Sequence, residues 1–335
     1  MSQRSGKAVQ YERFGAFDVV QIVPIERPSP GPGEIVVQVA AAGLNHIERF
    51  LREGRLQDRL TVELPARQGV DFSGVVVTVG EGAKRFKVGD EVLGHAPEGG
   101  THATWVTVPE TAAIRKPVRL PLEVAGGLYL AGCTAAEIVD GLRLGRDDTV
   151  VISAAAGGVG HIQAQLARQA GAHVISLGSD GNHDFLRQIG THPVLYGDGE
   201  EQRIRSAAEG RAITAFIDNH GSGADLARQL GVAEGRFVSS EQRRDIEVRL
   251  LRAPAGDTET EQRLTRIAKL VADRQLTVLV SGFYPFDLIT EAYRDLAELH
   301  SRGKVVVGMQ AVESGERQGW YLTEKARTLH QRAEA

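Results

Sequence analysis

Apolar and polar positions follow two different patterns along the chain. Between residues 7 and 110 the apolar positions form short runs, such as EIVVQVA and GVVVTVG, which glycine, proline and aspartate separate. Such runs between turn residues are typical of an antiparallel β domain. From about residue 121 predicted strands alternate with helical patterns, which indicates βαβ units on a parallel sheet.

The second pattern predicts a nucleotide-binding type of domain followed by a returning segment. We expect strands at 149–153, 173–178, 193–196, 213–218 and 235–240, and helices at 161–170, 183–189 and 223–230. A last helix at 286–301 and a strand at 304–310 are expected to return to the first domain. The predicted division is 1–120, 121–260 and 261–335, and the last part ends in a charged tail from residue 313.

A glycine-rich turn joins the first strand of the second domain to its helix. Ala155, Gly157 and Gly160 form the pattern A-x-G-x-x-G. In dinucleotide-binding domains the first small residue permits a tight turn, the second lets the backbone approach a pyrophosphate, and the third lets helix and strand pack closely. Because a strand precedes the turn and a helix and a second strand follow it, the pattern favours a dinucleotide site over an ordinary tight turn.

The end of the second strand bears on the choice of coenzyme. An NAD-specific site carries Asp or Glu there, whereas this chain has Gly178 and Ser179. A carboxylate would repel a 2′-phosphate, and a serine can donate a hydrogen bond to it, so we predict NADP(H). NAD(H) stays open, because Asp180 is adjacent and no Arg or Lys occurs between residues 174 and 186, which leaves His183 as the nearest cation.

Composition excludes several classes of protein. The chain has 335 residues, 42% of them hydrophobic and 24% charged, which is typical of about two globular domains. A net charge of −4 gives no electrostatic footprint for nucleic acid or an acidic membrane. The start is polar and no apolar run has the length of a spanning helix, so we expect a cytoplasmic protein. Cys133 is the only cysteine, so no intramolecular disulfide can form.

Five motifs in order carry a resemblance to a known family. The segments GDEVLG, GGTHATWVTVPE, AGCTAAE, ISAAAGGVG and HSRGKVVVGM make the chain similar to the zinc-independent quinone oxidoreductase branch of the medium-chain dehydrogenase/reductase superfamily. The resemblance implies an α/β fold in which a GroES-like, mostly-β catalytic domain is split around a Rossmann domain with a doubly wound parallel sheet. It also implies an active site in the cleft between the domains, usually a homodimer, and NADPH-driven reduction of quinones or α,β-unsaturated carbonyls.

The resemblance also implies that catalytic zinc is absent. Zinc-dependent relatives carry Cys where this chain has Asn45, and Gly-His-Glu where it has Gly69, Val70 and Asp71. His95 and His102 lie on a predicted loop without a set of partner ligands, so we expect them to be surface residues.

The catalytic residues follow from the same resemblance. Asn45 matches the family asparagine that faces the nicotinamide, although it is also the expected cap of a helix at 46–52. Phe50 stands where the family often has a tyrosine proposed as the proton donor. Protonation would then come from water, from His46 or from another group, and a solvent-exposed loop histidine is the alternative for His46.

The remaining predicted contacts are with the cofactor. By resemblance or by position at the carboxyl edge of the sheet they are Thr134, Ala155, Ala156, Gly157, Gly158, Val159, Gly160, Gly178, Ser179, Tyr196, Asn219, His220 and Lys304. Three alternatives stay open. Tyr196 could be a half-buried aromatic at a strand end, Asn219 and His220 could form an ordinary turn, and Lys304 could be a solvated lysine.

The sequence therefore predicts a zinc-independent, NADPH-dependent reductase of quinones or of the C=C bond of enones. A zinc-free carbonyl reductase or alcohol dehydrogenase and a catalytically silent NADPH-binding protein remain as alternatives. The partner is a small molecule, and the segment GFYPFD suggests either aromatic walls for a planar or apolar substrate or part of the core. The physiological substrate, the proton donor, the oligomeric state and the role of the tail stay open.

Overall fold

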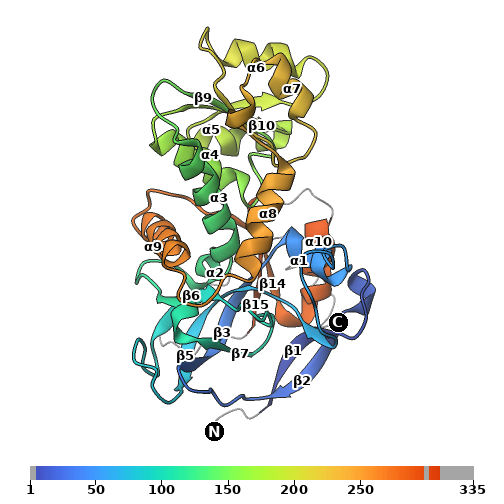
Figure 1. Cartoon of the computed structure of the whole chain (residues 1–335), viewed down its shortest axis with the longest axis vertical. Helices are drawn as coiled ribbons and strands as arrows, with labels where there is room; N and C mark the ends of the chain where they lie inside the picture. The colour runs from blue at the N-terminus through green and yellow to red at the C-terminus, as the bar shows by residue number, and fades with distance from the viewer. Residues whose placement is uncertain (1–4, 298–301, 310–335) are drawn as a thin grey trace.

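The strands in the described part of the chain form three sheets (Figure 1). The structure is a computed structural model, and it describes residues 5–297 and 302–309. A three-stranded antiparallel sheet has the order β2-β1-β4, in which β1 is Ser5–Tyr11, β2 is Gln21–Glu26 and β4 is Ala66–Arg67. The other two sheets carry the parts of the molecule that concern function.

A seven-stranded sheet contains segments from both ends of the described chain. Its order is β14-β15-β3-β5-β6-β8, and β7 also pairs with β3. β15 runs antiparallel to the second half of β3, while β7 pairs with the first half. The strands are β3 (Glu34–Leu44), β5 (Asp71–Val79), β6 (Glu91–His95), β7 (Trp105–Pro109), β8 (Ala113–Arg115), β14 (Val280–Pro285) and β15 (Lys304–Gly308).

A five-stranded sheet in the middle of the chain is parallel throughout, with the order β11-β10-β9-β12-β13. The chain order reverses on either side of β9, and in open α/β sheets ligands bind at the carboxyl ends of the strands beside such a reversal. The strands are β9 (Thr149–Ile152), β10 (His173–Gly178), β11 (His192–Leu195), β12 (Ala215–Ile217) and β13 (Phe237–Val238).

Helices connect the two large sheets and cover them (Figure 1). They are α1 (His46–Arg52), α2 (Leu122–Ala125), α3 (Tyr129–Leu142), α4 (Gly160–Gln169), α5 (His183–Gln188), α6 (Glu200–Ala207), α7 (Ala224–Gln229), α8 (Ser240–Leu251), α9 (Thr258–Ala272) and α10 (Ile289–Ala297). Short 3-10 turns lie at Phe17–Val19, Glu110–Ala112, Asp180–Asn182, Glu234–Arg236 and Phe286–Leu288.

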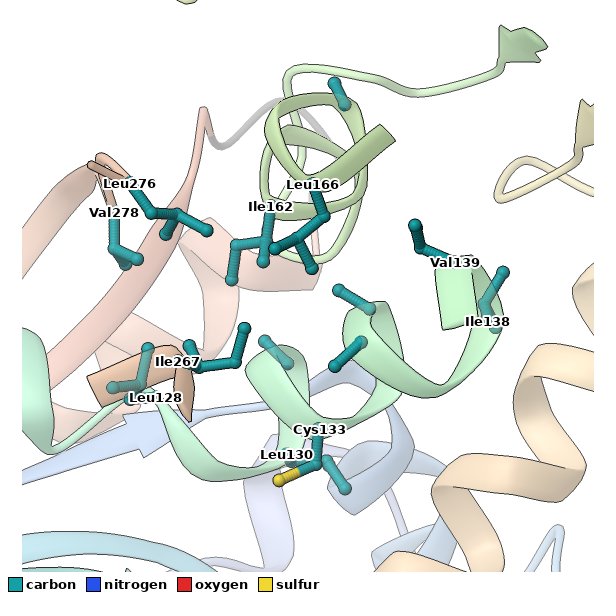
Figure 2. Packing of buried hydrophobic residues seen from close by; sticks show 14 of the residues in the cluster. Leu128, Leu130, Cys133, Ile138, Val139, Ile162, Leu166, Ile267, Leu276 and Val278 are labelled. Atoms are coloured by element: carbon teal, nitrogen blue, oxygen red, sulfur yellow. The ribbon is translucent and has the colours of Figure 1, made fainter. Parts of the chain in front are cut away.

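The largest core cluster surrounds α3. Leu128 precedes this helix and Cys133 lies on it, and Ile162 from α4 and Ile267 from α9 pack in the same cluster (Figure 2). Cys133 is wholly buried, and burial raises the pKa of its thiol, so it packs as a small apolar side chain. This cluster holds α3, α4 and α9 against one another.

The element predictions differ from the structure mainly at strand ends. The predicted strands at 213–218 and 235–240 shorten to β12 and β13, because Ser239 begins the cap of α8. Phe283 and Tyr284 of the GFYPFD segment are buried in core clusters, which supports the core interpretation of that segment. Residues 298–301 of the predicted last helix, Gln310 and the tail from 313 lie outside the described residues. The division at residues 120 and 260 stays a prediction.

Candidate active site

The glycine-rich turn follows β9 directly and closes tightly. Ala154 has a φ of +45°, a conformation that alanine seldom adopts, and its carbonyl accepts the N–H of Gly157 at 3.0 Å. A Cβ on Gly160 would lie 2.4 Å from that same carbonyl oxygen, so the close approach of α4 to the turn requires glycine there. A Cβ on Gly157 would meet only that oxygen, at 3.2 Å.

The turn offers backbone donors at the start of α4. No hydrogen bond joins the N–H groups of Gly158 and Val159 to another residue in the part of the chain that the structure describes. His161 donates from Nδ1 to the Gly157 carbonyl at 2.7 Å and fixes the turn from within α4. Unpaired N–H groups at a helix start favour an anion, so the turn, including buried Ala155 and Ala156, fits a pyrophosphate.

The start of β15 lies against this turn, although it is far away in the sequence. The N–H of Gly303 donates to the Ala156 carbonyl at 2.8 Å, and Gly303 forms a bridge with Gly157. The stem of Lys304 then passes Gly158, where a Cβ would lie 3.2 Å from Lys304 Cδ. A lysine is therefore in contact with the turn that would hold the coenzyme phosphates.

Lys304 reaches a group of four polar side chains, which we call the buried polar cluster: Asn45, Glu48, Asp71 and Lys304. Lys304 Nζ donates to Asn45 Oδ1 at 2.6 Å and to the Leu44 carbonyl at 3.1 Å. The amide of Asn45 donates to Asp71 at 3.3 Å and to Glu48 at 3.4 Å. All four side chains are buried, so the prediction of a solvated lysine is wrong.

The fold explains why these residues meet. Asn45 caps α1, and Glu48 accepts its backbone N–H at 3.0 Å, as in a capping box. Glu48 also accepts the N–H of Val70, and Asp71 on β5 accepts the N–H of Leu130. The pairing of β15 with β3 then brings Lys304 to the end of β3, where α1 begins.

Burial controls the charges in the cluster. It raises the pKa of Glu48 and of Asp71 to about 7, and the Lys304 ammonium opposes the rise in both. Burial lowers the pKa of Lys304, while the charges of Asp71, Glu48 and Glu247 oppose that change. Glu48 and Asp71 therefore titrate near neutral pH, a property common at functional sites.

His46 and Phe50 lie on α1 beside this cluster. His46 is half-buried rather than exposed, and burial, together with Arg243 and Lys304, lowers its pKa to about 4. A neutral imidazole is a poor proton donor near pH 7, and this weighs against His46 in that role. The ring of Phe50 lies between the guanidinium groups of Arg55 and Arg244, at 4.3 and 5.2 Å.

The end of β10 gains a cation that the sequence pattern did not reveal. Arg302 donates from Nε to Asn182 Oδ1 at 2.7 Å and also bonds the Gly181 carbonyl. Asn182 in turn donates to the Ser179 hydroxyl at 3.0 Å. The Asp180 side chain is 96% exposed. Gly178 is buried, and a Cβ there would lie 3.0 Å from Leu186, so packing accounts for this glycine.

The sequence pattern did not predict Arg302 as the cation of the 2′-phosphate site, because that pattern concerns only residues near the end of the second strand. Arg302 is 120 positions from Asn182 and reaches it through the bridge between Gly303 and the glycine-rich turn. The signal available was the Arg-Gly-Lys triplet at the start of the last predicted strand, which places two cations on either side of a glycine.

The end of β12 is joined to the end of β9 by hydrogen bonds. Asp218 accepts the Ser153 hydroxyl at 2.8 Å and the backbone N–H groups of His220, Gly221 and Gly223. Asn219 donates to the Ser153 carbonyl at 3.0 Å. This turn lies beside the glycine-rich turn, as predicted for the carboxyl edge of the sheet, and the nicotinamide-ribose role of Asn219 and His220 stays a prediction.

The structure gives the burial of two further predicted cofactor residues, Thr134 and Tyr196. Thr134 is wholly buried on α3, and its hydroxyl has no partner among the described residues. Tyr196 follows β11 and is 55% exposed, so the expectation of a half-buried strand-end aromatic is wrong. The contacts predicted for both residues stay predictions.

The expectation that His95 and His102 are surface residues is wrong. Both are buried. His95 stacks on Tyr129 with ring centroids 4.2 Å apart, and its Nε2 bonds the Ala253 carbonyl. His102 bonds Tyr293 at 2.7 Å and the Gly43 carbonyl at 3.1 Å. Hydrogen bonds and ring contacts with Tyr129, Tyr293 and two backbone carbonyls take the place of hydrogen bonds to water for these two imidazole rings.

Over residues 5–297 and 302–309, no three His, Cys, Asp or Glu side chains form a group that could hold a metal ion.

A surface hollow of about 580 Å³ lies away from this site, between β8 and α9. Its cations are paired, since Arg85 bonds Glu261 at 2.5 Å and Lys269 bonds Asp273 at 2.6 Å. We therefore assign no ligand to it.

No helix in the described part of the chain is long and apolar enough to cross a membrane.

Comparisons with known proteins agree with this architecture. Residues 31–118 match the alcohol dehydrogenase GroES-like domain family, and residues 189–307 match the zinc-binding dehydrogenase family. The chain is 28% identical over 324 residues to a probable quinone oxidoreductase from Schizosaccharomyces pombe, which covers 90% of this chain and 97% of that protein.

Solved structures are similar over the same length. The quinone oxidoreductase from Coxiella burnetii has 27% identity and a TM-score of 0.76 over 91% of this chain and 100% of that one. Mycobacterial Rv1454c complexed with NADPH has 26% identity and a TM-score of 0.74 over 90% and 99% of the two chains. The chain therefore belongs to the medium-chain dehydrogenase/reductase superfamily of NAD(P)H-dependent oxidoreductases, in its quinone oxidoreductase-like branch.

Proposed function

We propose that the protein uses NADPH to reduce quinones and the C=C bond of α,β-unsaturated carbonyls without a catalytic zinc ion. One observation carries this proposal. The Lys304 side chain spans from the glycine-rich turn at Gly158 to Asn45, so a coenzyme site and a buried polar cluster lie one side chain apart. When bound, the reduced nicotinamide supplies a hydride.

The residues of this chain supply binding and orientation. The N–H groups of Gly158 and Val159 bind the pyrophosphate, and α4 adds the positive end of its dipole. Ser179 and Arg302 hold the 2′-phosphate, and this pair supports NADP(H) over NAD(H). The complex of mycobacterial Rv1454c with NADPH supports the same preference.

The zinc-free mechanism has its own support. The Lys304 ammonium already provides a positive charge beside Asn45 and Asp71, the positions at which zinc-dependent relatives carry Cys and Glu. A metal ion there would have to displace a buried cation. The expected homodimer and cytoplasmic location stay predictions.

The loss of NADPH absorbance with a quinone, an enone and the matched saturated ketone tests the proposal. We expect turnover with the first two. Turnover of the ketone alone would indicate a carbonyl reductase, and tight NADPH binding without any turnover would indicate a binding protein. Both results contradict the proposal.

A variant of the turn tests the coenzyme site directly. Gly157→Val should abolish NADPH binding, measured by NADPH fluorescence, because its side chain fills the approach to the turn, while the far-UV circular dichroism is retained. The matched control is Gly145→Val, at the opposite end of β9, where a Cβ meets no atom within 4 Å.

A further inference from the structure

The amide of Asn45 has no donor left for a substrate. Its two N–H groups go to Asp71 and Glu48, and its oxygen accepts Lys304. A primary amide carries only two donors. Asn45, which the sequence predicts as the residue facing the nicotinamide, is therefore fully bonded within the protein, and another group must contact the acceptor oxygen.

Lys304 has the donor that Asn45 lacks. An ammonium group carries three N–H bonds. Two of them go to the Leu44 carbonyl at 3.1 Å and to Asn45 Oδ1 at 2.6 Å. Among the described residues no further acceptor is bonded to Nζ. One N–H bond of this buried ammonium group therefore has no partner among the described residues, and it lies next to the glycine-rich turn.

Two glycines leave room for the side chain of Lys304. A Cβ on Gly127 would lie 3.2 Å from Lys304 Cε, and a Cβ on Gly158 would lie 3.2 Å from Lys304 Cδ. Gly127 follows α2, whereas Gly158 belongs to the glycine-rich turn. The aliphatic part of the Lys304 side chain therefore passes between the segment after α2 and the glycine-rich turn. Its Nζ atom then lies in the buried polar cluster.

The charges that face Lys304 come from several elements. Three carboxyl groups oppose the loss of its proton, and the imidazoles near it are neutral because burial lowers the pKa of each to about 4. The acids are Glu48 on α1, Asp71 on β5 and Glu247 on α8, and the imidazoles are His46, His102 and His161. Arg243 on α8 and Arg49 on α1 are the other cations near His46.

We infer that Lys304 is a catalytic residue, whose third N–H contacts the carbonyl oxygen of the acceptor and gives it a proton. The inference rests on the proposed function. A hydride from the reduced coenzyme would bring two electrons to the acceptor and form a C–H bond at the β-carbon, as a C–H bond of the coenzyme and the C=C π bond of the acceptor break. The electron pair of the C=O π bond would then move to the carbonyl oxygen. That oxygen then takes a proton, so an O–H bond forms and an N–H bond of Lys304 breaks. The resulting enol returns to the saturated carbonyl in solvent. Solvent returns one proton to the amine in each turnover.

Lys304→Met tests this role, but it leaves buried carboxyl groups without their cation and could prevent folding. The double variant Lys304→Met/Asp71→Asn removes one of these charges. If Lys304 only balances charge, the double variant should fold and turn over the enone normally, and this result would overturn the inference. We expect it to fold, with enone kcat at saturating NADPH reduced about 10²-fold to 10³-fold, as for the loss of an oxyanion donor.

Lys304→Arg separates proton donation from charge. Arginine keeps a cation and its donors but does not give up a proton. We expect this variant to bind NADPH and to lose the solvent deuterium isotope effect together with most of kcat on the enone. Full turnover by the arginine variant would overturn proton donation by Lys304.

A readout without turnover uses p-nitrophenol as a mimic of the oxyanion. The wild-type protein with NADP⁺ should bind the phenolate form, seen as its visible absorbance band, and Lys304→Met/Asp71→Asn should lose this band. An unchanged band in the double variant would overturn the contact. Because this measurement needs no reduction, it separates failure of the inference from failure of the proposed reductase activity.

Discussion

Arg302 and Lys304 lie two positions apart at the start of β15 and contact different parts of the proposed coenzyme site. Gly303 between them has a φ of +67°, and a Cβ there would lie 2.2 Å from the Leu279 carbonyl. This glycine allows the backbone to bond Ala156. Arg302 then reaches Asn182 beside the five-stranded sheet, and Lys304 reaches Asn45 at the end of β3.

Arg302→Ala tests the coenzyme preference at the level of one residue. Loss of a hydrogen bond from a charged donor costs about 1.5–3 kcal/mol. We expect the Kd for NADPH to rise about 10-fold to 100-fold, and the Kd for NADH to stay unchanged, in fluorescence titrations.

The control for this prediction is Arg228→Ala, since Arg228 is exposed on α7 and pairs with Asp225. It should leave both dissociation constants unchanged. Equal losses of NADPH and NADH binding in Arg302→Ala would contradict a contact with the 2′-phosphate.

At the scale of elements, the contact of α4 with the end of β9 decides the shape of the turn. Gly160 lies where the first turn of the helix meets the Ala154 carbonyl. His161 in the same turn bonds the Gly157 carbonyl and accepts the N–H of Leu279 at 3.3 Å. Helix, turn and returning segment are thus held together at one point.

Gly160→Ala should destabilise this contact. Its Cβ would overlap backbone atoms, and overpacking of this kind costs about 1–3 kcal/mol. Urea unfolding should show the loss. The matched control is Gly141→Ala on α3, where a Cβ meets nothing within 4 Å. This control should raise the free energy of unfolding by about 0.5–1 kcal/mol, because alanine is the better helix former. A Gly160→Ala variant as stable as the wild type would contradict the close packing.

At the scale of the whole molecule, the seven-stranded sheet joins segments distant in sequence. β15 pairs with β3, and this pairing brings Lys304 to Leu44 across 260 positions. The same pairing places the Lys304 cation near the buried carboxyl groups of Asp71, Glu48 and Glu247. The stability of the whole fold therefore depends on the protonation of this cluster.

Stability should pass through a maximum as pH changes. His46, His102 and His161 have pKa values lowered from 6.5 to about 4, so the folded protein binds fewer protons than the unfolded chain and stability rises with pH across that interval. Glu48 and Asp71 have pKa values raised to about 7, so the folded protein binds more protons and stability falls as pH rises toward 7. The pKa values of His95 and His192 are also lowered and that of Glu247 is also raised, so five histidines outweigh three carboxyl groups below pH 6.5. Above it the histidines of both states are neutral, and the carboxyl groups with raised pKa values decide the slope.

Thermal unfolding across this range measures the prediction. We expect the highest Tm near the ordinary histidine value of 6.5 and a lower Tm at about pH 8. Asp71→Asn removes one of these carboxyl groups and should weaken the fall above the maximum. A Tm that rises steadily from about pH 5 to pH 8 would contradict the raised pKa values.

Much of the fold was predictable because it depends on local patterns. Strands β9 and β10, helix α4 and the turn between them are encoded within thirty or so neighbouring residues by periodicity and by small residues, which act over a few positions. The strand ends at β12 and β13 were less predictable, because pairing and the cap at Ser239 decide where they stop.

By itself the sequence determined the order of elements, the glycine-rich turn and the family resemblance, since all three are written in neighbouring residues. Only the tertiary structure decided that His95 and His102 are buried. It also decided that Arg302 donates a hydrogen bond to Asn182 and that Lys304 donates one to the amide oxygen of Asn45. Burial and charge pairing depend on which distant segments meet, and strand pairing between β3 and β15 creates neighbours that no local pattern can specify.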